Sequence, residues 1–175
     1  PLFLGRLTEM NRRWNLVGHD YVHNVLLSTP PQSLLVAKKD VQIFSLWYYH
    51  HVVKLRPDIH LIPQGLAHSP WYQNSSRRFG SSLNLSRLSD LNGWKQLHAD
   101  NLQPIYATID VDLHPEIEVG TPRGMVLPLF GQGPNETDPN SGKGLDLWHF
   151  MLSRGDWRAE RRPDFSLPIL LATMP

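Results

Sequence analysis

The chain has no cysteine among its 175 residues. This absence excludes disulfide bonds, thiolate nucleophiles and cysteine-bound zinc. No apolar run approaches the roughly 20 residues that a helix needs to cross a bilayer, and no signal peptide is recognisable. The sequence starts at Pro1 without a methionine and stops inside the apolar phrase 166–175. We therefore expect it to be a piece of a longer protein.

Neither sign of charge dominates the composition. The 17 lysines and arginines face 16 acidic residues, for a formal net charge of +1. Such a balance argues against nucleic acid as the main partner. The motifs of common enzyme classes are also missing, since there is no Gly-x-Ser-x-Gly elbow, no phosphate-binding Walker loop and no dinucleotide fingerprint. We accordingly assign no catalytic residue, no resident metal and no cofactor.

What the sequence does contain is a compact β-α-β pattern between Pro30 and Tyr72. The apolar run Ser33–Ala37 does not alternate, which is typical of a strand covered on both faces. Asp40 stands where a helix N-cap is expected, and a helix of roughly four turns follows. Its expected buried face consists of Val41, Phe44, Trp47, Tyr48, His51 and Leu55. A second strand over 59–62 then predicts a right-handed parallel crossover.

The remaining segments extend this pattern. We expect further helices over 19–28, 70–79 and 89–99, the last weakened by Gly93 by roughly 1 kcal/mol, and further strands over 104–109 and 123–130, the last at an edge because Pro128 interrupts it. The predicted fold is a small three-layer α/β domain with a mostly parallel sheet and a Rossmann-like β-α-β core. The predicted organisation is a membrane-proximal arm (1–18), the α/β core (19–130) and a C-terminal part (131–175) holding a flexible loop, a short helix over 145–153 and a truncated tail.

Candidate binding residues lie where the parallel strands are expected to end, because ligands of open α/β sheets sit beyond those carboxyl ends. Lys38 and Lys39 beside a helix N-terminus could hold a phosphate or a lipid headgroup, although Asp40 places a negative charge at the same spot. The alternative is a solvated loop with a helix cap. The complete candidate set is Lys38, Lys39, Asp40, His68, Trp71, Tyr72, Asp110 and Asp112.

Two patterns allow a metal-binding interpretation and a structural one. Asp110, Asp112 and His114 alternate, so their side chains could share one strand face and bind a divalent ion; the favoured alternative is a strand leaving the core. His19 and His23 lie four residues apart, but no glutamate follows His19 to form the His-Glu-x-x-His pattern. Packing or surface positions are therefore expected for both histidines.

Aromatic residues could stack on sugar rings if they are exposed. The four in question are Trp47, Tyr48, Trp71 and Tyr72. Their periodic placement favours the core instead. For the adjacent His50 and His51, we expect one ring at the core and the other in water.

Three segments carry a resemblance to a known family. The segments are 34–48, Arg56-Pro57-Asp58 and Ser69-Pro70-Trp71-Tyr72, and the first holds the phrase Phe-x-Leu-Trp-Tyr at 44–48. In this order they resemble motifs of bacterial and eukaryotic membrane proteins similar to protein O-mannosyltransferases. The preceding helix and the strands at 103–106 and 123–129 also fit, so the resemblance spans residues 19–130.

The resemblance implies a parent protein with a transmembrane bundle of the C-type glycosyltransferase fold, followed by an extracytoplasmic region that corresponds to this chain. In such enzymes the essential acid lies near the first transmembrane helices, outside the part matched here. The implied partners are the membrane-embedded remainder of the same chain and an acceptor protein or glycan. The implied location is the periplasmic or extracellular face of a membrane.

The departures from the family pattern concern its acidic turn. Where the family has Gly-Asp-Asn-Asp-Thr, this chain has Lys39-Asp40-Val41-Gln42-Ile43, so Asp40 is the one acid kept. Ser45 also replaces a proline. If that turn binds a metal or a sugar in relatives, this chain has lost or altered that property.

Three hypotheses follow. The first is a non-catalytic extracytoplasmic accessory domain of a glycosyltransferase-like membrane protein, which docks an acceptor or braces the membrane core. The second is a carbohydrate-binding module that uses Trp71, Tyr72 and the strand-end loops. The third is a free-standing α/β enzyme, which requires Asp40, Asp110, Asp112 and His114 to converge on one pocket.

Overall fold

The computed structural model describes residues 16–78 and 83–131. In chain order the elements are α2 (Val17–Ser28), β1 (Leu34–Ala37), α3 (Asp40–Trp47), the π-helical turn η1 (Tyr48–Val52), β2 (His60–Pro63), α4 (Pro70–Arg78), α5 (Leu91–Asp100), β3 (Ile105–Thr108) and β4 (Val126–Pro128). Apart from Gly131, the predicted C-terminal loop, helix and tail lie outside the described residues, as does nearly all of the predicted N-terminal arm.

The sheet has the strand order β2-β1-β3-β4. Strand β1 pairs in parallel with both β2 and β3, so Val36 lies between Ile62 and Ala107. Strand β4 pairs with β3 in the antiparallel sense. The predicted mostly parallel sheet is confirmed, and so is an edge strand that contains Pro128.

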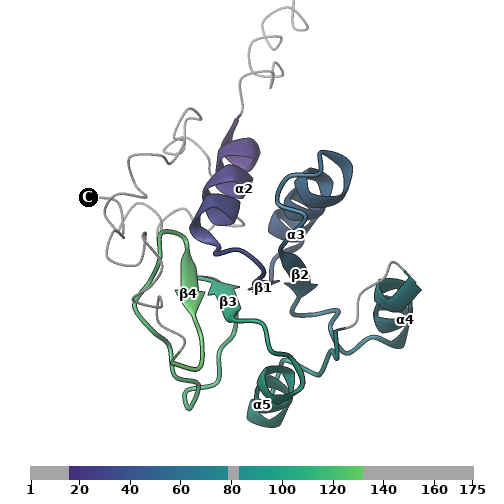
Figure 1. The fold of residues 1–175 in the computed structure, drawn as a ribbon, viewed down its shortest axis with the longest axis vertical. Helices are drawn as coiled ribbons and strands as arrows, with labels where there is room; N and C mark the ends of the chain where they lie inside the picture. Colours follow the sequence, from purple (N-terminus) through teal and green to yellow (C-terminus); the bar gives the residue numbers. More distant parts are fainter. Residues whose placement is uncertain (1–15, 79–82, 132–175) are drawn as a thin grey trace, which may run out of the picture.

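Helices cover both faces of the sheet, as Figure 1 shows for α2 and α3 on one side and α5 on the other. Successive strand residues point to opposite faces. Leu35 therefore joins a core with Tyr21 and Leu46 from the α2–α3 side, whereas Leu34 joins a core with Trp94 from α5. These two cores make the domain a three-layer α/β structure, as predicted.

The helix after β1 differs from its prediction in length and in orientation. Helix α3 ends at Trp47, and the chain continues as η1, in which the Val53 amide donates to the Tyr48 carbonyl at 3.1 Å. The residues that α3 buries are Gln42, Ile43 and Leu46. The predicted buried face was wrong for Phe44, Tyr48 and His51, which are exposed, because this short helix carries two apolar stripes and the aliphatic one faces the sheet. Val41, Trp47 and Leu55 are partly buried and pack against the core, as predicted.

Asp40 was wrongly predicted to be the N-cap of this helix. The N-cap is Lys39 in an extended conformation, and its side chain makes no capping hydrogen bond. Asp40 is instead the first helical residue and is exposed. Its carboxylate still lies near the positive end of the helix dipole, where a negative charge is stabilising.

Gly93 has a structural role that its low helix propensity hides. A Cβ atom at this position would lie 1.6 Å from the carbonyl oxygen of Arg87. The glycine therefore allows α5 to pack directly against the preceding chain. Asp90 caps the same helix, since its carboxylate accepts a bond from the Gly93 amide at 2.8 Å.

Candidate functional site

The carboxyl ends of β1 and β3 lie side by side at the topological switch point, where the strand order reverses. From β1 the chain crosses through α3 to β2 on one side, while β3 lies on the other side of β1. Such a switch point is where open α/β sheets bind ligands. Here it brings together Lys38 and Asp112, whose Nζ and Oδ2 atoms are 2.6 Å apart.

Gln64 fixes the loop that carries Asp112. Its Nε2 atom donates to the carbonyl oxygens of Leu88 and Asp112, at 2.9 and 2.8 Å. Its Oε1 atom accepts from the Asp112 amide at 3.1 Å. The buried Gln64 side chain thus replaces missing backbone partners at the end of β2. Gln64 was not among the predicted binding residues, although a polar residue directly after an apolar strand was an available signal.

A second polar group lies buried under α2 and α3. The Tyr21 hydroxyl donates to Oε1 of Gln42 at 2.8 Å, and both residues are buried. Burial, and then the nearby Asp110 carboxylate, raise the pKa of Tyr21 well above its usual value, an effect that the Thr108 hydroxyl partly offsets. This phenol therefore stays protonated and acts as a hydrogen-bond donor. Sequence periodicity missed the pair because Tyr21 and Gln42 belong to different helices.

The strand face that was one of two interpretations of residues 110–114 does not form. Strand β3 ends at Thr108, and the chain turns there, with the Val111 amide donating to the Thr108 carbonyl at 3.1 Å. Asp110 consequently turns toward Tyr21, whereas Asp112 is exposed and pairs with Lys38. His114 accepts a bond from the Glu116 amide at 3.3 Å within its own turn.

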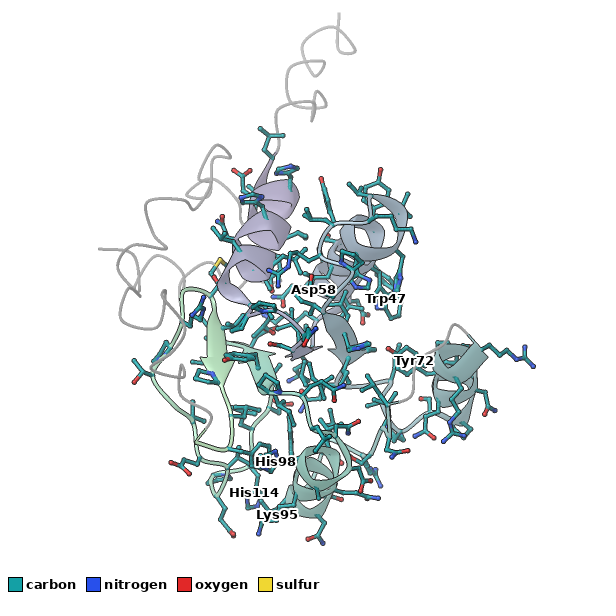
Figure 2. All side chains as sticks on the ribbon, in the orientation of Figure 1. Trp47, Asp58, Tyr72, Lys95, His98 and His114 are labelled. Atoms are coloured by element: carbon teal, nitrogen blue, oxygen red, sulfur yellow. The ribbon has the colours of Figure 1, made fainter. Side chains whose placement is uncertain are left out.

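The proposed convergence on one pocket is therefore not what these contacts show. Asp110 and Asp112 face different neighbours, and Figure 2 draws His114 toward the α5 end of the molecule. His68 is exposed in the turn before α4. Within residues 16–78 and 83–131, no three histidine or acidic side chains are grouped closely enough to hold a metal ion.

Aromatic side chains form a continuous row from α3 to α4. We call this row, together with two valines at the end of η1, the aromatic face. The Phe44 and Trp47 rings contact edge-on at 5.7 Å, Trp47 stacks on Tyr72 at 6.3 Å, and Tyr72 contacts Trp71 edge-on at 5.9 Å. The members of the aromatic face are Phe44, Trp47, Tyr48, Val52, Val53, Trp71 and Tyr72.

Most of this face is open to solvent. The exposed fractions are 60% for Phe44, 54% for Tyr48, 66% for Val52, 50% for Val53 and 59% for Trp71. The favoured core assignment was therefore wrong for Tyr48 and Trp71. Trp47 and Tyr72 are half-buried and cover one another (Figure 2).

Side chains from η1 and α4 close the outer edge of β2. The Tyr72 hydroxyl donates to the Leu61 carbonyl at 3.2 Å, and Nε2 of His50 bonds to the Ile59 carbonyl at 2.8 Å. Burial raises the pKa of Tyr72 to about 12 and lowers the pKa of His50. Both residues thus have an edge-protecting role. His51 is exposed, as expected for one member of the histidine pair.

These features define a class: a small α/β domain with polar contacts at its strand ends and an apolar, aromatic face beside its β2 edge. Within the described ranges, no helix is both long enough and apolar enough to cross a membrane.

Comparison with known families adds one match. Residues 18–87 match the model of TMEM260-associated domain 2. Over these residues the chain is thus similar to a domain associated with a family of membrane proteins. The match includes α2, the β-α-β unit and the whole aromatic face, and it stops before α5. No solved structure matches the chain.

Proposed function

We propose that this chain is a non-catalytic accessory domain of a glycosyltransferase-like membrane protein, held at the extracytoplasmic face of the membrane. There it braces the membrane-embedded part of the same protein or docks the acceptor. The observation that carries the proposal is the match of residues 18–87 to a domain associated with a membrane-protein family. Those residues are also the ones that build the aromatic face.

The contacts at the strand ends support a role without catalysis. Lys38 and Asp112 neutralise each other, and the Gln64 amide is fully engaged with main-chain groups. Tyr21 and Gln42 bond to each other inside the domain. The Gln64 and Tyr21–Gln42 contacts thus hold one part of the fold to another, which is what a scaffold requires.

The first test is to read the parent gene outward from both ends of this chain and scan the product for membrane spans. We expect several spans upstream, and protease added to intact cells should cleave the domain. A photoreactive amino acid in place of Phe44, introduced into the full-length parent protein, then separates bracing from acceptor docking. Bracing predicts cross-links within the parent chain, whereas docking predicts cross-links to a second protein. A short parent without spans would overturn the proposal.

One observation favours carbohydrate binding as a second candidate. Trp71 is exposed, which a sugar-stacking residue requires. Tyr72 fits less well, because Trp47 covers one side of its ring and its hydroxyl is bonded to the Leu61 carbonyl. Titration of the chain with oligosaccharides, with Trp71→Ala as the control, tests this candidate directly.

A further inference from the structure

We propose that the aromatic face, with the basic residues around it, seats on the surface of an anionic lipid bilayer. The inference rests on the proposed function in one respect, because the parent would hold the domain next to a membrane. It goes further by naming lipid headgroups as a direct partner of residues in this chain.

The first argument is the chemistry of the exposed side chains. Of the phenyl, indole, phenol and valine side chains of the aromatic face, five are at least half exposed. Contiguous apolar surface of this kind marks an interaction site. Tryptophan and tyrosine favour the boundary between hydrocarbon and water, because each combines an apolar ring with a polar atom.

The second argument is charge. Between Val41 and Ser89 the sequence has five lysines or arginines and a single acidic residue, Asp58. The remainder of the chain has twelve basic and fifteen acidic residues. The formal charge of the chain is therefore strongly divided, and the segment that carries the aromatic face is its positive part.

Local contacts strengthen that division. Asp58 is held by Arg56 through two bonds of 2.9 Å, which keeps the pKa of its carboxyl at about 2. Lys54 follows the exposed valines, and Arg77 and Arg78 end the exposed side of α4. These three cations are exposed, so they can approach lipid phosphates while the rings enter the headgroup layer.

The third argument is that two polar groups at the face are already bonded within the fold. The Tyr72 hydroxyl and the His50 ring are bonded to the β2 edge. A sugar would need several directed polar partners beside an open ring, whereas an interfacial surface needs apolar area and a cationic rim. The combination of Trp71, Tyr48 and exposed cations is typical of a surface that binds at the membrane–water interface.

The experiment is vesicle flotation of the full 175-residue chain. The probes are phosphatidylcholine vesicles with and without phosphatidylglycerol. We expect binding to the anionic vesicles that weakens about ten-fold or more without phosphatidylglycerol and declines as salt is added. Trp71→Ala should weaken binding about ten-fold, and Arg77→Gln or Arg78→Gln roughly five-fold each.

Two matched variants outside the face serve as controls. Leu102→Ala removes a fully exposed leucine, and Lys95→Gln removes an exposed cation on α5, which Figure 2 places far from Trp47 and Tyr72. Both should bind vesicles like the parent chain. Because every variant keeps residues 1–15 and 132–175, any binding by those parts is constant across the series. Quenching by brominated lipids should be weaker in Trp71→Phe than in the parent.

The outcomes separate this inference from the proposed function. Absent or charge-independent vesicle binding, or an equal loss in the control variants, would overturn the inference. Binding to an oligosaccharide or a protein without binding to vesicles would also overturn it. Membrane spans in the parent gene together with no vesicle binding would remove the inference alone. Vesicle binding by a chain whose parent has no spans would remove the proposed function alone.

Discussion

The two edges of the sheet are closed in different ways. At β4 the main chain returns along the edge, since Gly120 donates to the Pro128 carbonyl at 2.9 Å and Phe130 to the Glu118 carbonyl at 2.8 Å. At β2 the closure comes from side chains, because Tyr72 and His50 bond to the free carbonyls of Leu61 and Ile59. Both solutions prevent pairing with another chain.

The difference teaches which apolar residues the fold needs. Beside the main-chain closure at β4, the Phe130 ring stacks on His98 with ring centroids 4.3 Å apart. The side-chain closure at β2 requires Tyr72, with Trp47 stacked on it, but nothing in that edge requires Phe44, Tyr48 or Trp71 to be aromatic. Exposed apolar area beyond what folding uses is the reason to assign this side of the domain to binding.

The largest expected effect on stability is that of an alanine at Gly93 on the α5 side, compared with an alanine at Gly65 on the β2 side. Gly93→Ala puts a methyl group into the Arg87 carbonyl, so α5 must shift, and we expect a loss of about 3 kcal/mol of unfolding free energy. Gly65→Ala, after β2, meets no atom within 4 Å and should change stability by less than about 0.5 kcal/mol. Denaturant unfolding followed by tryptophan fluorescence measures both. Equal effects would mean that the α5 side is no more tightly packed than the β2 side.

A smaller loss of stability is expected when Arg56, which ties the segment before β2 to the end of α2, is replaced. Arg56 donates to the carbonyls of Leu26 and Thr29, at 2.7 and 3.0 Å, as well as to Asp58. Arg56→Gln should cost about 2 kcal/mol at about pH 7. Arg87→Gln, at an exposed arginine before α5, is the control and should cost little.

The pH dependence of that effect has a definite sign. The Arg56 hydrogen bonds are the main cause that lowers the pKa of Asp58 from 3.8 to about 2. A carboxyl with a lowered folded-state pKa stabilises the fold above its unfolded pKa and loses this contribution as pH falls. The cost of Arg56→Gln should therefore shrink between about pH 4 and pH 2. A carboxyl titration by NMR that shows no rise in the Asp58 pKa in the variant would contradict this.

The sequence allowed the order of the elements to be predicted because its signals are local. The apolar run at β1 and the two prolines before it specify a strand and its start without distant information. The parallel strand ends also placed Lys38 and Asp112 at one edge of the sheet, and the structure brings them into contact.

What could not be predicted depends on contacts between elements. Helix α3 has an aliphatic stripe with Ile43 and Leu46 and an aromatic one with Phe44 and Trp47, and periodicity alone does not say which one meets the sheet. The bond between Tyr21 and Gln42 joins two helices. The need for Gly93 depends on where the Arg87 carbonyl lies, which no propensity scale contains.

The smallest effect is expected for the pair that links the two sides of the switch point. Lys38 and Asp112 are close, but their side chains are 40% and 73% exposed. Water and salt screen such a pair, so a double-mutant cycle with Lys38→Met and Asp112→Asn should give a coupling below about 0.5 kcal/mol. The Asp112 loop would stay in place, because Gln64 holds the Asp112 main chain through two hydrogen bonds and is itself bonded to the Leu88 carbonyl. A coupling several times larger that persists at high salt would mean that this ion pair holds the Asp112 loop together with Gln64.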